Sequence, residues 1–297
     1  MTDFLNCRGE LRINESLAKH TSWRVGGIAR QFYKPTDKAD LGQFLSQLPE
    51  SEPVLWLGLG SNLLVRDGGF PGTVISTAGI LQNFTVKTDS IEAEVGVYCS
   101  KLAKQASKAS LSGGAFFAGI PGTFGGALAM NAGAHGTETW SLVSQVTTVD
   151  RQGQFHQRTP DEFDISYRHV VGPKEEWFIA GTVKLEKGDQ AEETAEIKSL
   201  LKRRNETQPT SQPCAGSVFR NPGNDFAGRL IEISGLKGLS IGGAAVSEKH
   251  ANFIVNTGEA TAADIESLIL LVQQKIALEH GCLLYTSDAA DEEESVD

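Results

Sequence analysis

Two glycine-rich segments contain the residues whose types and spacing are best suited to bind a charged ligand. The first, Gly58-Leu59-Gly60-Ser61-Asn62, follows the apolar run 54–57. Glycines at a strand end let backbone N–H groups approach a diphosphate, and the two polar side chains add hydrogen-bond donors. The alternative, more frequent for an isolated Gly-x-Gly, is a tight turn. The third glycine of G-x-G-x-x-G is missing and no helix is expected next, which disfavours a Rossmann site.

The second segment is much richer in glycine and covers residues 113–136. It contains AGIPGTFGGA (118–127) and MNAGAHG (130–136). Small residues let a large flat or anionic group lie against the backbone, with Thr123 and Asn131 available to orient it. The alternative is a glycine-rich crossover with a purely structural role.

The elements that must hold these segments alternate between strands and helices. Apolar residues at helical spacing, with Asp37 as N-cap, predict a helix over 37–48 between strands at 24–34 and 53–66, which is a β-α-β start. Further strands are expected within 73–98 and over 142–150, 154–158 and 177–186, and further helices over 99–111 and 191–206.

The last element expected from the sequence is a helix over 261–280. Thr261 and Asp264 form a capping-box pattern at its start, an apolar stripe follows, and Gly281 stands where a C′ residue belongs. The helix expected over 191–206 is followed by a linker rich in helix-breaking residues. This change in amino-acid composition predicts a domain boundary near residue 190.

Composition and charge exclude several classes of partner. The 297 residues carry a formal net charge of −10, and six of the acids lie within 285–297, so the rest of the chain carries −4. Such a body offers no basic surface for nucleic acid or an anionic membrane. No apolar run approaches the roughly 18 residues of a membrane span, and the N-terminus lacks the apolar core of a secretion signal. The P-loop pattern GxxxxGK[ST] is also absent.

The cysteines and histidines indicate no metal. Cys7, Cys99, Cys214 and Cys282 are far apart and form no CxxC pair, which argues against a zinc site or a disulfide framework and favours the cytoplasm. The histidines show no spacing typical of metal ligands. Nothing in the sequence indicates an oligomeric state.

Several long blocks, in order from about residue 17 to 284, resemble the UDP-N-acetylenolpyruvoylglucosamine reductase (MurB) family. The blocks are TSWRVGG (21–27), LGLGSNLLV (57–65), AGIPGTFGGALAMNAGAHG (118–136), SYRHV (166–170), AGSVFRNP (215–222) and GLKGLSIGGAAVSEKHANFIVN (235–256). Because several blocks match in order, this resemblance is more specific than any single motif.

The resemblance implies an α+β fold of the FAD-binding vanillyl-alcohol-oxidase (PCMH) type. Two FAD-holding subdomains would cover residues 1–78 and 79–190, and a substrate-binding domain residues 191–284. The implied reaction uses FAD and NADPH to reduce the small molecule UDP-N-acetylglucosamine enolpyruvate to UDP-N-acetylmuramate. This step belongs to peptidoglycan precursor synthesis, and so to cell-wall biogenesis, cell shape and cell division. The segment 177–205 has no insertion, so the chain resembles the short type without the extra substrate loop.

The resemblance also implies a set of site residues. The catalytic residues would be Tyr167, Arg168 and Ser217. The substrate would further contact Asn221, Lys249 and His250, although a surface role is equally expected for the last two. The cofactor would contact Gly58, Gly60, Ser61, Asn62, Leu63, Gly119, Pro121, Gly122, Thr123, Gly125, Gly126, Asn131, Ala132 and Gly133.

The chemistry of the implied reaction explains why such residues are needed. Adding hydride to the enolpyruvyl double bond builds negative charge on C2 and on the carboxylate, and a positioned cation such as Arg168 lowers that barrier. Tyr167 would help to seat the substrate. Ser217 would donate the proton to C2: a hydroxyl is a weak acid, but the C2 carbanion is a strong base.

The sequence departs from the family after Leu284. The family carries a third catalytic group, a Glu in a short strand of the form L-x-P-E-V, and by spacing Ser287 stands at its position. No residue is carried over for that role. The acidic tail 285–297 is expected to be disordered or foreign to the fold. The consequence expected is a flavoprotein that accepts hydride from NADPH but completes the second half-reaction slowly.

Two alternatives stay open at this point. One is another FAD oxidoreductase of the same fold, since a fold hosts many reactions. The blocks GSVFRNP and SEKHANF argue against it, because they match the substrate domain. The other is a protein that binds FAD or a UDP-sugar without turnover.

Overall fold

The computed structural model describes residues 4–286, which form two compact units. Unit 1 comprises residues 4–15, 30–59 and 71–202, and unit 2 comprises residues 16–29, 60–70 and 203–286. Two N-terminal segments therefore belong with the C-terminal part of the chain. The change of unit falls inside helix α4 (Gln190–Thr207), which begins at the predicted boundary near residue 190. The finer division at residues 78, 190 and 284 stays a prediction.

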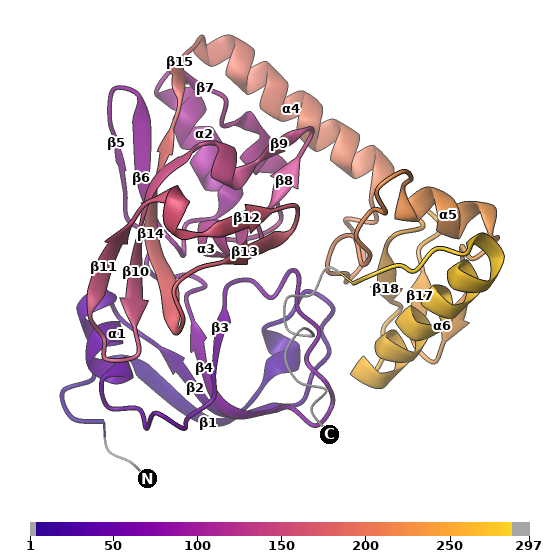
Figure 1. Cartoon of the computed structure of the whole chain (residues 1–297), viewed down its shortest axis with the longest axis horizontal. Helices are drawn as coiled ribbons and strands as arrows, with labels where there is room; N and C mark the ends of the chain where they lie inside the picture. Colours follow the sequence, from indigo (N-terminus) through magenta and orange to yellow (C-terminus); the bar gives the residue numbers. More distant parts are fainter. Residues whose placement is uncertain (1–3, 287–297) are drawn as a thin grey trace. The chain divides into compact units, whose positions relative to one another are not determined.

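Unit 1 is built on two sheets (Figure 1). The four-stranded sheet has the order β1-β2-β4-β3, and its β3–β4 pair is parallel. The five-stranded sheet has the order β11-β10-β14-β6-β5 and is antiparallel. These strands are β1 (Glu10–Ser16), β2 (Ile28–Lys34), β3 (Val54–Leu57), β4 (Phe70–Ser76), β5 (Phe84–Val86), β6 (Ser90–Glu94), β10 (Val143–Asp150), β11 (Phe155–Arg158) and β14 (Glu176–Lys184).

Short helices and hairpins complete unit 1. The helices are α1 (Lys38–Leu45), α2 (Cys99–Lys108) and α3 (Phe124–Ala129), with 3-10 turns η2 (Ala115–Gly119), η3 (Thr139–Ser141) and η4 (Pro160–Glu162). The small strand pairs are β7 (Leu111–Ser112) with β15 (Glu186–Lys187), β8 (Gly133–Ala134) with β9 (Thr137–Glu138), and β12 (Asp164–Ser166) with β13 (His169–Val171). The predicted N-cap of α1 is confirmed, because the Asp37 carboxylate accepts a hydrogen bond from the Asp40 backbone N–H. Buried aromatic rings, among them Phe44, Phe117 and Phe124, fill the core of this unit.

Unit 2 packs two helices with a small antiparallel sheet. Its elements are η1 (Leu17–Lys19), α5 (Ala227–Ile233), α6 (Ala262–His280), β16 (Ser240–Ile241), β17 (Ala244–Val246) and β18 (Ile254–Asn256). The predicted helix over 261–280 is confirmed: Thr261 and Asp264 form the capping box, and Gly281 closes the helix in the left-handed conformation. Apolar residues of α5 and α6, including Ile231 and Leu268, form the core.

The two N-terminal segments are fastened to unit 2 by specific polar contacts. Trp23 Nε1 donates to the Ile254 carbonyl at 2.8 Å, and both carboxylate oxygens of Asp67 accept from the backbone N–H groups of Ala262 and Ala263. The predicted strand over 24–34 starts only at Ile28, and the Gly27 N–H before it donates to the Arg66 carbonyl in unit 2. Within the described residues, no helix is both long and apolar enough to cross a membrane.

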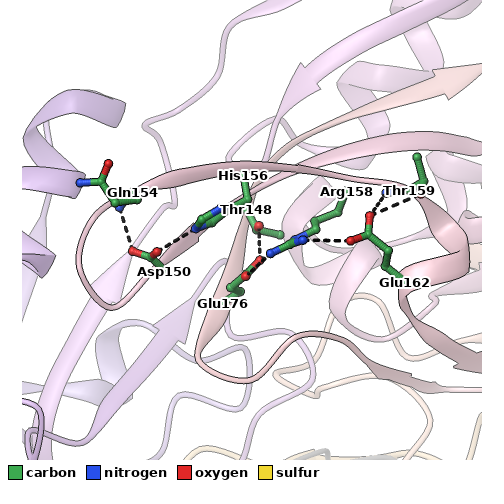
Figure 2. A network of polar contacts seen from close by, with 8 residues as sticks. All are labelled: Thr148, Asp150, Gln154, His156, Arg158, Thr159, Glu162 and Glu176. Carbon is green, nitrogen blue, oxygen red and sulfur yellow. Dashed lines mark hydrogen bonds and ion pairs between the residues drawn. The ribbon is translucent and has the colours of Figure 1, made fainter.

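A polar network fixes the edge strand β11 to the five-stranded sheet of unit 1 (Figure 2). The Arg158 guanidinium contacts both carboxylate oxygens of Glu176, with Nη2–Oε1 at 2.6 Å and Nε–Oε2 at 3.1 Å. The Thr148 hydroxyl donates to the same carboxylate at 2.6 Å. Beside them, His156 Nε2 lies 2.7 Å from Asp150 Oδ2. The Glu176 side chain is only 9% exposed, so this paired charge is shielded from water.

We expect Glu176→Gln to lower the free energy of unfolding by about 1–3 kcal/mol at neutral pH, because a charge-assisted contact is lost. The hydrogen bond from Arg158 lowers the pKa of Glu176. Its stabilisation is therefore present above the unfolded-state pKa and is lost as pH falls through the folded-state pKa. Urea unfolding at neutral and acidic pH measures both effects. The control is Glu92→Gln in the exposed Lys87–Glu92 pair, and equal losses in the two variants would contradict the expectation.

Candidate active site

The structure brings the two glycine-rich segments together at one place in unit 1. Gly58 follows β3, and Thr123 is the N-cap of α3, its hydroxyl accepting from the Gly126 backbone N–H at 3.4 Å. A Cβ added to Gly58 would lie 2.6 Å from Thr123 Oγ1. The backbone at residue 58 therefore lies directly against the start of α3, which a side chain would prevent.

The glycines of the second segment have different reasons to be glycine. A Cβ on Gly125 would lie 2.8 Å from Val95 Cβ, so close packing against Val95 requires glycine at position 125. A Cβ on Gly126 would meet only Thr123 Oγ1, at 3.8 Å, so the space beside it is open. Thr123 is only 1% exposed, whereas Gly126 is exposed, so a bound group would reach the backbone of Gly126 rather than the Thr123 hydroxyl.

Asn131 uses its side chain inside unit 1. Its amide nitrogen donates to Glu138 Oε2 at 2.8 Å and to the Ser166 carbonyl at 3.1 Å, and its amide oxygen accepts from the Trp140 backbone N–H at 3.0 Å. The side chain is buried, and the backbone adopts φ 41°. Asn131 therefore ties the glycine-rich segment to Ser166, the last residue of β12.

The other expected residues of this segment lie on either side of α3. Ala132 accepts hydrogen bonds at its carbonyl from both the backbone N–H and the hydroxyl of Thr139. Gly133 pairs with Glu138 in the β8–β9 hairpin. Gly119 is the last residue of the turn η2, and Pro121 follows two residues later. The Gly122 carbonyl accepts a hydrogen bond from the Cys99 backbone N–H.

Tyr167 and Arg168 are the two central residues of the β12–β13 hairpin. Ser166 and His169 pair across the hairpin, so only these two residues form the loop. Arg168 adopts φ 55°, and its guanidinium carbon lies 5.6 Å from the centre of the Tyr167 ring. Tyr167 is 46% exposed. The hairpin loop thus carries a cation and an aromatic ring side by side. The hydrogen bond from the Asn131 amide to the Ser166 carbonyl holds the backbone just before this loop.

The rest of the first glycine motif belongs to unit 2. Gly60 adopts φ 59°, and a Cβ there would lie 2.2 Å from the His20 carbonyl oxygen, so this position requires glycine. Its own carbonyl accepts from the Ser22 backbone N–H at 2.9 Å. Ser61, Asn62 and Leu63 come next in the sequence. Further along the same segment, the Asp67 carboxylate accepts hydrogen bonds from the first residues of α6.

Ser217 lies in a half-buried stretch of unit 2 just before a paired segment. The Val218 N–H donates to the Asn252 carbonyl, and the Arg220 N–H donates to the Tyr285 carbonyl at 2.8 Å. Phe219 forms a β-bridge with Thr286. Backbone pairing therefore continues two residues beyond Leu284, where the sequence predicted the ordered domain to end. Ser287 and the rest of the predicted acidic tail lie outside the described residues.

The three remaining expected residues also lie in unit 2. The Asn221 side-chain oxygen accepts from the Ala227 backbone N–H at 3.1 Å, at the start of α5. Lys249 donates to the Asn205 carbonyl in the last turn of α4. His250 Nδ1 accepts from the Asn252 backbone N–H at 3.2 Å. Burial lowers the pKa of His250, so at neutral pH the ring is uncharged, with its proton on Nε2.

Asn252 is the residue that sequence reasoning missed. It lies in the SEKHANF block, but it was not singled out because an asparagine between Ala251 and Phe253 carries no signal for a distant partner. Its contacts with the Ser217 segment appear only in the fold. Among residues 4–286, no three His, Cys, Asp or Glu side chains gather as a metal site would require.

Comparison with known proteins first defines the class. The model of the FAD binding domain matches residues 29–158, and the model of the UDP-N-acetylenolpyruvoylglucosamine reductase C-terminal domain matches residues 208–287. With its mixed helix and sheet content, the chain is a FAD-binding protein of the α+β vanillyl-alcohol-oxidase type, as the sequence predicted.

The relatives define the family. The UDP-N-acetylenolpyruvoylglucosamine reductase of Alkalilimnicola ehrlichii is 56% identical over 276 residues, which is 93% of this chain and 93% of the relative. That of Legionella pneumophila strain Corby is 56% identical, over 91% of this chain and 88% of the relative. The crystal structure of the Thermus caldophilus enzyme superposes with a TM-score of 0.80 at 33% identity, covering 94% of this chain and 97% of that one. The chain belongs to the UDP-N-acetylenolpyruvoylglucosamine reductase family, and the predicted resemblance is confirmed.

Proposed function

We propose that this chain reduces UDP-N-acetylglucosamine enolpyruvate to UDP-N-acetylmuramate, with NADPH as the source of hydride. The observation that carries the proposal is the 56% identity to reductases of this name over 93% of the chain. When bound, FAD supplies the hydride that is added to the double bond. The exposed backbone of Gly126 and the close approach of Gly58 to Thr123 fit that cofactor.

Arg168 stabilises the negative charge that develops during hydride addition. The charge builds on C2 and on the substrate carboxylate, and a guanidinium stays protonated at every relevant pH. The two-residue loop fixes the backbone on both sides of Arg168, and its guanidinium carbon lies 5.6 Å from the centre of the Tyr167 ring. Tyr167, beside it, supplies a ring and a hydroxyl that seat the substrate.

Ser217 donates the proton that C2 needs once the hydride has added; addition without this proton reverses, so net reoxidation of the flavin depends on Ser217. Its hydroxyl is a weak acid, so the transfer depends on a strongly basic carbon and on fixed geometry. Asn221 and His250 lie in the same unit and are proposed to contact the substrate, each as an uncharged hydrogen-bonding group. Lys249 would contribute only if it leaves the carbonyl of Asn205.

We also propose a cytoplasmic location. The four cysteines are unpaired, as expected in a reducing compartment, and the nucleotide-linked substrate and NADPH are intracellular metabolites. The slow second half-reaction predicted from Ser287 stays a prediction, since that position lies outside the described residues.

The experiment that tests the function combines cofactor binding with product analysis. FAD is added to the flavin-free protein and the visible spectrum is followed, and then NADPH consumption is measured with and without the enolpyruvyl substrate. We expect a bound flavin band and substrate-dependent NADPH oxidation, with UDP-N-acetylmuramate identified by mass spectrometry. If the rate of NADPH oxidation is the same with and without the enolpyruvyl substrate, the result would instead favour another FAD oxidoreductase of this fold.

We expect Gly58→Ala to weaken FAD binding by at least about tenfold, because the new Cβ would lie 2.6 Å from Thr123 Oγ1 and push the two segments apart. Titration of flavin-free protein with FAD, followed by fluorescence quenching, gives the dissociation constant. Gly68→Ala is the matched control, because a Cβ there meets no atom within 4 Å. Equal FAD affinity in the two variants would contradict the assignment of Gly58.

A further inference from the structure

The side chain of Asn252 is bound to the backbone just after Ser217. Its amide oxygen accepts from the Phe219 N–H at 2.9 Å, and its amide nitrogen donates to the Phe219 carbonyl at 2.9 Å. Its own backbone carbonyl accepts from the Val218 N–H at 2.9 Å. One residue therefore makes three hydrogen bonds to the dipeptide that follows the proposed proton donor.

These contacts need an asparagine. The Phe219 N–H requires an acceptor and its carbonyl requires a donor, and a primary amide offers both at fixed spacing. A carboxylate would place an oxygen against the Phe219 carbonyl oxygen, and an apolar side chain would lose both bonds to Phe219. Asn252 is 4% exposed and Phe219 is 1% exposed, so water cannot easily replace the lost bonds.

The backbone just before Ser217 bends at Gly216. Gly216 adopts φ 75°, and a Cβ added to it would meet nothing within 4 Å. Ser217 therefore lies between this bend and the dipeptide tied to Asn252. The bonds of Asn252 thus fix the backbone on the C-terminal side of Ser217.

Asn252 is itself held rigidly. Its backbone N–H donates to His250 Nδ1, and the loop around it is closed by bonds from the Ser247 N–H to the Phe253 carbonyl at 2.8 Å and from the Phe253 N–H to the His250 carbonyl at 3.0 Å. Because this loop is held in place, it restricts the positions of Val218 and Phe219, which it binds, and so of the adjoining Ser217 backbone.

We infer that Asn252 is a positioning residue for Ser217. This inference rests on the proposed function, because it concerns the step in which Ser217 gives up its proton. Proton transfer requires heavy atoms at hydrogen-bond distance, and a displacement of about 1 Å costs roughly 10²-fold in rate. Loss of the Asn252 contacts therefore slows that step while leaving hydride uptake from NADPH intact.

The test compares Asn252→Asp with Asn256→Asp in the intact flavoprotein. Asn256 is a matched control: it is 6% exposed, and its amide binds the backbone of Trp23, Gly258 and Ala260. Rapid mixing measures flavin reduction by NADPH and, separately, reoxidation by the enolpyruvyl substrate. We expect N252D to slow reoxidation about 10- to 100-fold relative to N256D, with equal reduction rates. If N252D does not fold, Asn252→Ser takes its place, because it removes the contacts without adding charge.

Two further measurements separate positioning from a loss of stability. In the double variant S217A/N252D, a residue that acts through Ser217 adds no further slowing to that of S217A. Hydrogen exchange of the peptide containing Val218 and Phe219 should be faster in N252D than in N256D, whatever the activity. Additive slowing, or equal reoxidation rates in N252D and N256D, would overturn the inference. Failure of the unaltered flavoprotein to reoxidise with substrate would overturn the proposed function instead, and the exchange measurement would then decide whether Asn252 fixes the Ser217 segment.

Discussion

Replacing Ser217 by alanine is expected to slow reduction of the enolpyruvyl substrate by a factor of about 10²–10⁴, while reduction of the flavin by NADPH keeps its rate. The reason is that the methyl group has no proton to give to C2, and water would have to reach the same place. The backbone of Val218 and Phe219 stays tied to Asn252, so the fold around the site is preserved.

Rapid mixing measures this effect as the rate of flavin reoxidation by substrate under anaerobic conditions. Ser234→Ala is the matched control, since Ser234 lies in the same unit and its hydroxyl pairs with His280. The rate is compared with that of the unaltered chain, so the ratio is meaningful even if the second half-reaction is slow. An S217A variant that reoxidises as fast as S234A would remove Ser217 from the mechanism.

Replacing Arg168 by methionine is expected to lower the rate of hydride transfer to the substrate by about 10²–10³-fold. The methionine keeps much of the side-chain volume but has no charge to stabilise the developing carbanion and carboxylate. Arg168→Lys should recover part of the loss, because the charge returns without the planar fork that can bind a carboxylate through two bonds.

The order of activities, unaltered chain above R168K and R168K above R168M, is the readout that a structural role would not produce. The matched control is Arg8→Met in the same unit, where Arg8 forms an exposed pair with Asp37. Flavin reduction by NADPH should be similar in all four proteins. Equal rates of substrate reduction in R168M and R8M would show that the Arg168 charge has no part in the reaction.

Local patterns predicted the elements that depend on local interactions. The helix after Asp37 and the helix between Thr261 and Gly281 were predicted with their caps, because a cap needs residues within one turn of it. The β14 strand and helix α4 also fall within one or two residues of the predicted 177–186 and 191–206.

The departures from prediction have long-range causes. The predicted strands over 24–34 and 53–66 are shorter in the structure, where β2 begins at Ile28 and β3 ends at Leu57. Residues 24–27 and 60–66 belong to unit 2, where the neighbouring Trp23 binds Ile254, 231 residues away in sequence. No local pattern contains that information.

The candidate site shows the same limit. The glycine motifs were recognised from their composition, but the contact of Gly58 with Thr123 joins segments that only the fold brings together. Asn131 was expected to face a cofactor, and the structure uses its amide to hold Ser166 and Trp140. The role of Asn252 depends on a partner 33 residues away. Sequence indicates which segments do chemistry, whereas the residues that position them are found through tertiary contacts.

The most direct test of the account is an anaerobic experiment on the purified chain loaded with FAD. NADPH is added first and the enolpyruvyl substrate second, while the flavin band is recorded. The account predicts bleaching by NADPH, followed by return of the band at a rate that depends on substrate concentration, with UDP-N-acetylmuramate formed in equal amount. A flavin band that bleaches but does not return with substrate, or no flavin band even with added FAD, would contradict it.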